Sequence, residues 1–585
     1  MFKRDFILLF FFVIFSSTII AQKKEASVEL NQLGFYPDAS KIAIIDSYDD
    51  IPATTFFIID NNTKDTVFSA SFDAQMLSKN SSLKTKVADF TSVTKPGEYY
   101  VAAPGVHDSY PFYIKENVLY PAAVGSLKGY YYTRISMPLE KQIAGKWSRP
   151  AGHPDTVVYV HPSAASAARP AGTIISSPGG WYDAGDYNKY IVNSGITVGT
   201  LLSAYEDFPS YFDTLRTNIP ESNDKVPDIL NEVLYNVRWM LTMQDANDGG
   251  VYHKCTNAAF DGMVMPGVTK LPRYVVQKST AATLDFTAVM AQCARIFKSF
   301  NKQLPGLSDS CLKAAKYAWI WAEKNPSIIY NQDSINKMFE PKITTGAYGD
   351  RYLKDEWLWA ATELMLSTKE EKYHKVFEQH LNDKVGLPSW SNVAMLAYYS
   401  FIRNEKNLQL PWKKDLRPMK DTIVTLANNY IKHIDDNAFK TVIGQTPRDF
   451  IWGSNAVAAN QSIVLINAYF ITKDNKYLDG ALTNLDYILG RNATGYCFLT
   501  GFGSHSTMHP HHRPSVADGI AEPVPGLLAG GPNPGRQDGC KYTFTEPETA
   551  YTDDDCSYAS NEIAINWNAP LVYVSNAIEA LQKKL

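Results

Sequence analysis

The chain lacks an excess of charge of either sign. Its 585 residues include 56 Lys and Arg and 60 Asp and Glu, which gives a net charge of −4. No long basic run is present either. Proteins that bind nucleic acid gather Lys and Arg on one face, so we expect no nucleic-acid partner.

Long apolar runs are absent after the N-terminus. Residues 1–21 join a basic start, MFKRDF, to the apolar stretch ILLFFFVIFSSTII and the small residue Ala21, which is typical of a secretory signal peptide. A membrane anchor is the alternative, but the stretch is shorter than the roughly 20 residues that cross a bilayer. We therefore expect a protein exported to the periplasm or outside the cell, acting as a monomer, with no membrane span after signal removal.

Cysteines are few, and one pair among the six is a candidate disulfide. Cys293 and Cys311 fall on apolar faces of predicted helices, where free, buried thiols are common. Cys540 and Cys556 flank one loop near an acidic motif. A disulfide there or two free thiols both remain open, because a sequence does not show connectivity.

Aromatic residues, in contrast, are frequent, at 13% of the chain. Trp and Tyr lie flat against sugar rings, but they also fill the core of a large helical protein. Composition leaves both roles open. The length exceeds what one hydrophobic core usually organises, so we expect two domains, one of them large.

The first domain is predicted to be a small all-β sandwich over residues 26–115. Short segments such as KIAIIDS, TTFFIID, KTKVADF and GEYYVAA are β-branched or aromatic and are separated by Asp, Asn, Gly and Pro. Such strands about ten residues apart indicate an immunoglobulin-like sandwich. Nothing in it clusters titratable groups, which favours a structural module over a carbohydrate-binding one.

The second domain, residues 118–585, is predicted to be mainly α. Apolar residues there recur with a period of about 3.6, and the pattern predicts about a dozen helices joined by loops rich in Gly and Pro. A closed double ring of helix hairpins and an irregular helical pile both fit this pattern. The predicted helices include residues 191–206, 226–244, 282–299, 310–324, 354–367, 372–382, 388–403, 419–434, 455–472, 475–489 and 568–583.

Two acidic motifs far apart in the chain are the strongest functional signal. WYDAGDYNKY holds Asp183 and Asp186 on a loop that follows two glycines, and YTDDDCSYASNEIAINWNA holds Asp553 and Glu562. Hydrolysis of a glycosidic bond needs a protonated carboxylic acid and an ionised carboxylate on opposite sides of the sugar. Taken alone, the first aspartate pair could equally cap a turn or a helix.

A third motif, GFGSHSTMHPHHRPS at residues 501–515, lies between the two acidic motifs in the sequence. It supplies His511 and Arg513, which can hydrogen-bond sugar hydroxyls. Metal binding is the alternative for such a run of histidines, but the Pro and Gly residues around it favour a rim that presents side chains.

These motifs resemble those of glycoside hydrolase family 9, the cellulase family with an N-terminal immunoglobulin-like domain. The resemblance covers nearly the whole mature chain and includes DAGD at residues 183–186 and TGFG followed by PHHR. Its most specific element is the spacing of Tyr551, Asp553, Tyr558, Glu562, Ala564, Asn568 and Ala569.

The resemblance implies an (α/α)6 barrel that cuts β-1,4-glucan with inversion at the anomeric carbon. Asp186 would be the general base that deprotonates water, Asp183 would help to orient that water, and Glu562 would be the general acid. Inversion requires carboxyls roughly 6.5 to 9.5 Å apart. Apolar neighbours of Glu562 would keep it protonated, and hydrogen-bond donors from the Gly-rich loop would have to keep Asp186 ionised beside Asp183.

Other roles follow from the same resemblance. His511 and Arg513 would bind the sugar next to the cut, and Asp553 would support the loop of the acid. Aromatic side chains would stack on sugars. Trp357 and Trp359 lie within a helical stripe and favour the core, and the better candidates for substrate contact are Trp181, Trp452, Tyr558 and Trp567.

Metals are not required for this chemistry, but family members often carry calcium. The stretch STAATLD ending at Asp285, together with Asp355, resembles such a site, and calcium takes oxygen ligands of this kind. N-capping of a helix is the alternative for each. Some relatives bind zinc through Cys and His before the DAGD loop. Here His153 and His161 have no Cys nearby, so a zinc site is not expected.

The expected substrate is a β-glucan polysaccharide or oligosaccharide, attacked internally. Two alternatives remain: an exo-acting glucosidase or glucosaminidase of the same fold, and a glycan-binding protein without activity. Retention of both Asp186 and Glu562 argues against the second. The sequence does not distinguish cellulose, mixed-linkage glucan, xyloglucan or a chitosan fragment.

Overall fold

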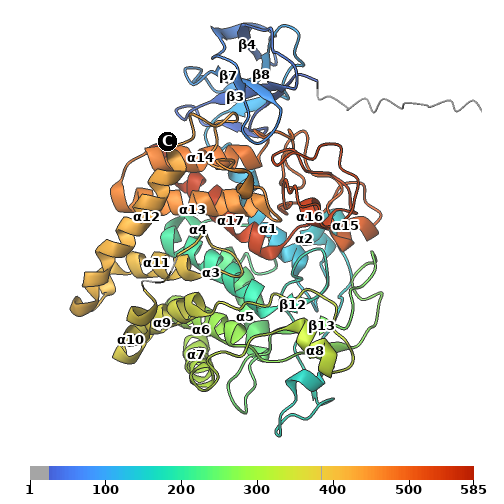
Figure 1. Ribbon diagram of the computed structural model, residues 1–585, viewed down its shortest axis with the longest axis vertical. Coiled ribbons are helices and arrows are strands. Elements are labelled where there is room, and N and C mark those ends of the chain that lie inside the picture. Colours follow the sequence, from blue (N-terminus) through green and yellow to red (C-terminus); the bar gives the residue numbers. More distant parts are fainter. Residues whose placement is uncertain (1–24, 382, 384) are drawn as a thin grey trace, which may run out of the picture.

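The structure is a computed structural model that describes residues 25–381, 383 and 385–585. A small β-domain sits at one end of a larger helical domain (Figure 1). The signal peptide predicted for residues 1–21 lies outside the described residues. Among the described residues, no helix has both the length and the apolar character that crossing a bilayer demands.

The N-terminal domain is a sandwich of two sheets in the described part of the chain. One has the order β1-β3-β7-β6 and the other β2-β9-β8-β4-β5. Phe35, Phe56, Phe90 and Phe112 meet between the sheets, as expected where alternate residues of each strand face inward. The strands are β1 (Ser27–Glu29), β2 (Gly34–Phe35), β3 (Ile42–Ser47), β4 (Thr55–Asp60), β5 (Thr66–Ser71), β6 (Met76–Leu77), β7 (Lys84–Asp89), β8 (Gly97–Ala102) and β9 (Phe112–Ile114).

The helical domain is a double ring in which inner and outer helices alternate along the chain. The inner helices are α3 (Ile191–Asp207), α6 (Thr280–Phe297), α9 (Lys354–Thr368), α11 (Ala394–Arg403), α13 (Ser454–Thr472) and α17 (Ile565–Leu581). The outer helices are α1 (Tyr120–Thr133), α5 (Asp228–Thr242), α7 (Leu307–Lys324), α10 (Glu371–His380), α12 (Leu416–Ile431) and α14 (Lys476–Ile488). Helix α3 packs on α6 and α17, and each outer helix packs on an inner neighbour.

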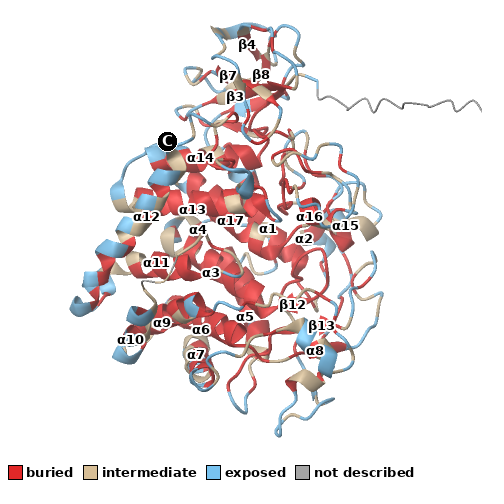
Figure 2. Ribbon diagram, viewed as in Figure 1, coloured by how far each residue is buried: buried red, intermediate tan, exposed pale blue. Residues whose placement is uncertain are grey.

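Sequence explains which helices lie inside. Helix α6 is buried on almost every face, whereas α7 buries one stripe containing Cys311, Ala315 and Trp319. A helix apolar all round belongs in the interior, and an amphipathic one belongs at the surface. Figure 2 shows this contrast as red inner and mixed outer helices. The predicted closed double ring is confirmed, and the irregular pile is wrong.

One helix boundary differs from the prediction. The pattern predicts a helix from residue 388, but α11 begins at Ala394. Pro388, Ser389, Trp390 and Ser391 instead lie in a loop that borders a large cavity. Ser389 and Asn392 exchange two backbone hydrogen bonds at 3.0 Å, which close a tight turn before the helix begins.

A small sheet inside the helical domain was not predicted. Its strands are β10 (Val158–Val160), β11 (Ile174–Ile175), β12 (Lys189–Tyr190), β13 (Lys254–Asn257) and β14 (Arg273–Val275), in the order β11-β10-β14-β13-β12. Strands of two to four residues are too short to show a period. Strand β12 forms the end of the WYDAGDYNKY motif, so the sheet anchors that loop.

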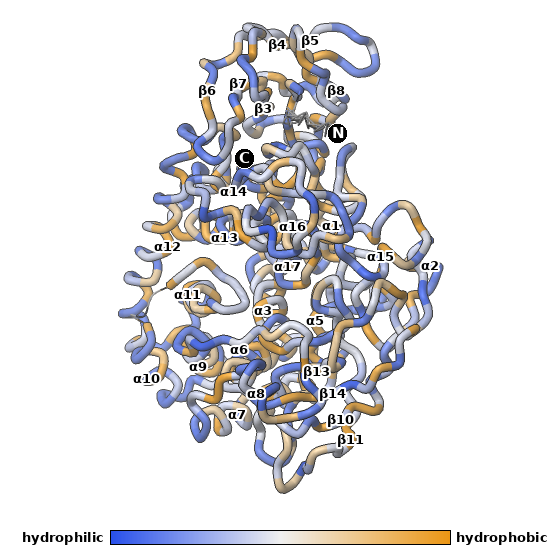
Figure 3. Tube along the Cα trace, turned by 45° about the vertical axis from the view of Figure 1, so that its right-hand side comes forward, coloured by the Kyte–Doolittle hydropathy of each residue, from blue (hydrophilic) through white to orange (hydrophobic). Residues whose placement is uncertain are grey.

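The two domains are joined by direct contacts. Asn31 donates a hydrogen bond to Asp486 at 2.8 Å, Ser78 donates to Glu548 at 2.6 Å, and Tyr48 stacks on Phe544. Figure 3 shows the sandwich seated above α14. Glu548 belongs to the segment before the second acidic motif. That segment is also closed by a disulfide between Cys540 and Cys556.

Candidate active site

A cavity of about 900 Å³ in the helical domain brings the predicted motifs together. Its lining comes from the DAGD loop, the loop before α11, the start of α13 and the segments before α15 (Arg513–Ala517) and α17. Eight of the predicted site residues line it: Asp183, Asp186, Trp452, His511, Arg513, Tyr558, Glu562 and Trp567.

The DAGD loop and the acid motif are bonded to each other. The backbone N–H of Gly185 donates to Glu562 Oε1 at 3.3 Å, and Ile565 N–H donates to the Asp183 carbonyl at 2.9 Å. A Cβ on Gly185 would lie 2.2 Å from the His511 carbonyl oxygen, so only glycine permits this approach. The two acidic motifs therefore share one cavity wall.

Within the described chain, Asp186 accepts side-chain hydrogen bonds on one oxygen only. Asn188 Nδ2 donates to its Oδ2 at 2.5 Å, and Tyr190 Oη donates to the same oxygen at 3.0 Å. Both donors stabilise the ionised carboxylate, and Oδ1 is left to accept from a water. The expected donors are thus present, but they come from side chains that follow the motif rather than from the glycine-rich backbone.

Asp183 differs from Asp186 in having both oxygens engaged. Asn193 donates to Oδ1 at 2.6 Å, and Tyr348 donates to Oδ2 at 2.7 Å. Burial and the neighbouring charge of Asp186 raise the pKa of Asp183. Two close carboxylates cannot both ionise easily, and Asp183 is the member whose pKa is raised.

Glu562 sits where a carboxylic acid keeps its proton. Burial raises its pKa well above the usual range, and the charges of Asp186 and Asp183 add to the rise. The hydrogen bond from Gly185 opposes the shift. A carboxyl group that stays protonated near neutral pH can act as a general acid.

His511 and Arg513 face the same cavity. His511 Nδ1 lies 2.6 Å from the Asp555 carbonyl oxygen, which only accepts, so Nδ1 carries the proton and donates. Burial lowers the pKa of His511, and the neutral ring therefore offers Nε2 as an acceptor. Arg513 donates to the Gly185 carbonyl at 2.6 Å and the Asp261 carbonyl at 2.9 Å, so it also holds the DAGD loop.

Asp553 does not line the cavity and instead contacts Asn561, the residue before Glu562. It accepts hydrogen bonds from the backbone of Met508 and His509, each at 2.8 Å, and from Asn561 at 3.1 Å. Asn561 immediately precedes Glu562. Asp553 thus ties the histidine-rich segment to the acid motif.

The predicted aromatic contacts divide into two groups. Trp452, 42% exposed, lies 5.4 Å from the ring of Tyr558, and Trp567 lines the same cavity. Trp181 is 0% exposed and packs against Tyr130 in the core. A fully buried ring offers no face to a sugar, so the predicted role of Trp181 in substrate contact is wrong.

The remaining tryptophan predictions agree with the fold. Trp359 is fully buried, and the partly buried Trp357 packs edge-on against Trp319. Neither lines the cavity of the acids.

Several residues that line the cavity or support its wall escaped the sequence analysis. Asn188 and Tyr190 lie within the quoted WYDAGDYNKY motif and could have been found as donors. Tyr348, Trp390 and Phe260 come from loops without any periodic pattern. Tyr348 adopts a φ of 46°, which is rare for a bulky residue and is found at functional sites.

A second group of buried carboxylates includes both predicted calcium ligands. Asp285 on α6 and Asp355 on α9 lie near Asp350 and Glu356. Burial raises the pKa of Asp285, Asp355 and Glu356, and the charges of neighbouring carboxylates in the group add to the rise. No hydrogen-bond donor within the described chain reaches six of their oxygens: Asp285 Oδ1 and Oδ2, Asp350 Oδ2, Asp355 Oδ1, and Glu356 Oε1 and Oε2. Unpartnered buried carboxylate oxygens are the donor set that Ca²⁺ prefers.

Another polar group has the composition of a metal site but a different geometry. His374, Glu378 and Asp415 have ligand atoms within 4.8 Å of one another. Glu378 lies beside Nδ1 of the imidazole, and Asp415 lies beside Nε2. A single ion can bind only one of these nitrogens, so the group reads as an ion-pair cluster.

His153 and His161 make separate contacts with the protein. His153 Nδ1 lies 2.8 Å from Tyr182 Oη, and His161 lies close to Ser163 Oγ and the Pro341 carbonyl.

Comparisons with known proteins agree with this architecture. The family described as Glycosyl hydrolase family 9 matches residues 120–575, and the family described as Cellulase N-terminal ig-like domain matches residues 23–108. The solved structure named Bacteroides ovatus GH9 superposes with a TM-score of 0.90 at 44% identity, over 95% of this chain and 99% of the other.

Two curated relatives are also similar over most of their length. A xyloglucan-specific endo-beta-1,4-glucanase of Bacteroides ovatus is 46% identical over 95% of this chain and 94% of its own. Endoglucanase D of Acetivibrio thermocellus is 32% identical over 94% of this chain and 83% of its own. The predicted family and fold are confirmed: the chain belongs to glycosyl hydrolase family 9, with an (α/α)6 barrel preceded by a cellulase-type immunoglobulin-like domain.

Proposed function

We propose that this glycoside hydrolase is an inverting endo-β-1,4-glucanase in which Glu562 is the general acid and Asp186 is the general base. One observation carries the proposal: Glu562, whose pKa is raised, and Asp186, whose Oδ1 is left for water, border the same cavity. Inverting hydrolysis requires that pairing.

The other site residues take supporting roles. Asp183 orients the attacking water from beside Asp186, and Asp553 holds the loop of the acid. His511 and Arg513 bind hydroxyls of the sugar next to the cut. Trp452, Tyr558 and Trp567 provide apolar faces on which pyranose rings stack.

The substrate we propose is a soluble β-glucan, with xyloglucan first. The relative that is 46% identical over 95% of this chain carries the name of a xyloglucan-specific endo-beta-1,4-glucanase. We further propose that residues 1–21 are the signal peptide of an exported precursor, residues 26–115 the sandwich domain and residues 118–585 the catalytic domain. The active protein would be a monomer.

Product analysis tests this function. Purified enzyme and the Glu562→Gln variant are incubated with xyloglucan, cellulose and soluble mixed-linkage glucan. Endo action predicts a rapid fall in viscosity and a range of oligosaccharides on xyloglucan, and none with Glu562→Gln. Release of single sugars would favour exo action, and binding without any product would favour a glycan-binding protein.

We also propose that the second carboxylate group binds a structural calcium ion. Asp285 and Asp355 would bind it together with Asp350 and Glu356, through the six oxygens of the group that have no donor within the described chain. The ion would neutralise buried negative charge and take no part in bond cleavage. Because α6 and α9 are neighbouring inner helices, calcium there would stabilise the barrel.

A further inference from the structure

We propose that Arg273 is a positioning residue that acts through Asn188 to fix the orientation of the Asp186 carboxylate. The inference rests on the proposed role of Asp186 as the base. It concerns a residue on β14, outside the cavity lining and outside every motif quoted above.

Arg273 uses all three guanidinium nitrogens. It is 5% exposed. Its Nε and Nη2 bond the two oxygens of Asp155 at 3.1 and 3.2 Å. Its Nη1 donates to the Tyr187 carbonyl at 3.0 Å, to Asn257 Oδ1 at 3.1 Å and to Asn188 Oδ1 at 3.3 Å. Arg273 thus reaches the residues that directly follow Asp186.

The amide of Asn188 can therefore point only one way. Its Oδ1 accepts from Arg273 Nη1, from the Asn257 backbone N–H at 2.9 Å and from Thr256 Oγ1 at 3.0 Å. The first two are obligate donors, so the oxygen must face them and the NH₂ group must face away. That NH₂ group donates to Asp186 Oδ2 at 2.5 Å. A flipped amide would instead set its oxygen against the carboxylate.

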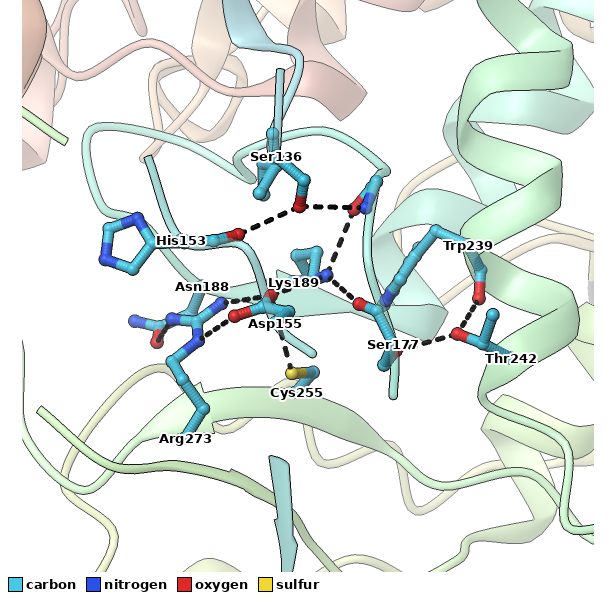
Figure 4. A network of polar contacts seen from close by, with 12 residues as sticks. Ser136, His153, Asp155, Ser177, Asn188, Lys189, Trp239, Thr242, Cys255 and Arg273 are labelled. Atoms are coloured by element: carbon cyan, nitrogen blue, oxygen red, sulfur yellow. Dashed lines mark hydrogen bonds and ion pairs between the residues drawn. The ribbon is translucent and has the colours of Figure 1, made fainter. Parts of the chain in front are cut away.

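Asp155 holds the guanidinium in place. Lys189 Nζ and Arg273 both contact Asp155 (Figure 4). These cations lower the pKa of Asp155 to about 2 despite its burial, so the carboxylate stays ionised. Lys189 also donates to the carbonyls of Ser177 at 2.7 Å and Gly179 at 3.0 Å.

The network clamps the DAGD loop at both ends. Lys189 fixes the segment that enters the loop, and Arg273 fixes the segment that leaves it through the Tyr187 carbonyl. Lysine could not replace Arg273, since one ammonium group cannot span Asp155, Tyr187 and Asn188 at once. An Arg273→Lys variant retains the charge beside Asp155 and loses the reach to Asn188.

A double-mutant cycle tests the inference. Arg273→Lys, Asn188→Ala and their combination are compared with wild type for melting temperature, kcat, KM and the pH profile of kcat/KM on a soluble oligosaccharide. If Arg273 acts through Asn188, each single change lowers kcat about tenfold, as expected for a misplaced catalytic group. The double variant is then no worse than the more impaired single variant.

The pH profile separates positioning from general stability. Loss of a donor to a carboxylate makes it bind its proton more tightly, so the acidic limb moves to higher pH in both single variants. The other ionisable groups around Asp186 are unchanged by these substitutions: Asp183, Tyr190, Lys254, Asp261, His511 and Glu562.

Arg295→Lys is the matched control. Arg295 is also buried in ion pairs, with Glu206 and Glu363, but it does not contact the DAGD loop. Its variant should lose melting temperature without a shift of the acidic limb. Should Arg273→Lys fail to fold, Asp155→Asn tests the same anchor with less change in volume. Additive effects in the cycle, or an unmoved acidic limb, would overturn the inference while leaving the wild-type activity as evidence for the proposed function.

Discussion

Two groups of buried carboxylates lie in the same barrel and differ in their partners. In the first, Asp183 and Asp186 each receive two side-chain hydrogen bonds and border a cavity with Glu562. In the second, Asp285 and Glu356 have no donor to either oxygen within the described chain. Burial raises the pKa of Glu562 and of Asp285 alike.

The contrast shows how hydrogen-bond donors separate the proposed catalytic carboxylates from the proposed calcium ligands. Donors that engage one oxygen of Asp186 stabilise its charge and leave the other oxygen for water, and Glu562 is left protonated. Without donors, the charge of the second group must be offset by a proton or a cation. Geometry around the oxygens therefore assigns the two groups different tasks.

Neutralising a carboxyl of the first group should give the largest effect. Asp186→Asn and Glu562→Gln each remove a proton-transfer group, so we expect kcat to fall by about 10² to 10⁴. The melting temperature should not fall, because an amide relieves repulsion among buried carboxylates. Assays of kcat alongside thermal melts check both points. Asp474→Asn, an exposed position in a salt bridge with Lys476, is the control, and an unchanged kcat for Glu562→Gln would refute the acid assignment.

Calcium bound to the second carboxylate group should stabilise the folded protein without taking part in catalysis. A ligand that binds only the folded state stabilises it by about 2.7 kcal/mol at 100 times its Kd, so Ca²⁺ should raise the melting temperature and EDTA should lower it. Asp285→Asn combined with Asp355→Asn should abolish this response. His374→Ala, in the ion-pair cluster, should leave the response intact. A calcium response that survives loss of Asp285 and Asp355 would place the ion elsewhere.

The same group predicts how stability depends on pH without calcium. Burial and neighbouring charges raise the pKa of Asp355 to about 6, above the value of about 3.9 in an unfolded chain. The folded state therefore binds more protons than the unfolded state across this interval, and stability falls as pH rises through it. Urea unfolding between pH 4 and 7, with and without Ca²⁺, measures the effect. Saturating Ca²⁺ should flatten the slope, and an equal slope in both conditions would contradict a cation at this position.

Sequence predicted the parts of the fold and the site that depend on local patterns. The period of the helices gave a mainly α domain, and the family resemblance gave the double ring. The motifs also indicated Asp186 and Glu562 as a pair, and both line one cavity. Asn188 and Tyr190 lay within a quoted motif but were not recognised as donors. Tyr348, Trp390 and Arg273 could not be assigned, because loops and a three-residue strand bring them to the site by long-range packing. Trp181 was misjudged because closeness to Asp183 in sequence does not decide which way a ring points.

Removal of a single hydrogen-bond donor to the first carboxylate group should have the smallest effect on activity. Tyr190→Phe removes one of two hydrogen bonds to Asp186 Oδ2. The ionised form is then less stabilised, so the acidic limb of the kcat/KM profile should move to higher pH, by up to about one unit. Tyr348→Phe removes a donor from Asp183 instead and should move it less. A larger shift for Tyr348→Phe would reverse the assigned roles of the two aspartates.

The stereochemistry of the first product tests the central claim most directly. Proton NMR of the anomeric signals during rapid hydrolysis of a soluble β-glucan oligosaccharide distinguishes the two anomers before they equilibrate. If Asp186 activates water while Glu562 protonates the leaving oxygen, the newly formed reducing end appears first as the α-anomer. Initial release of the β-anomer would mean a covalent, retaining route and would contradict the account.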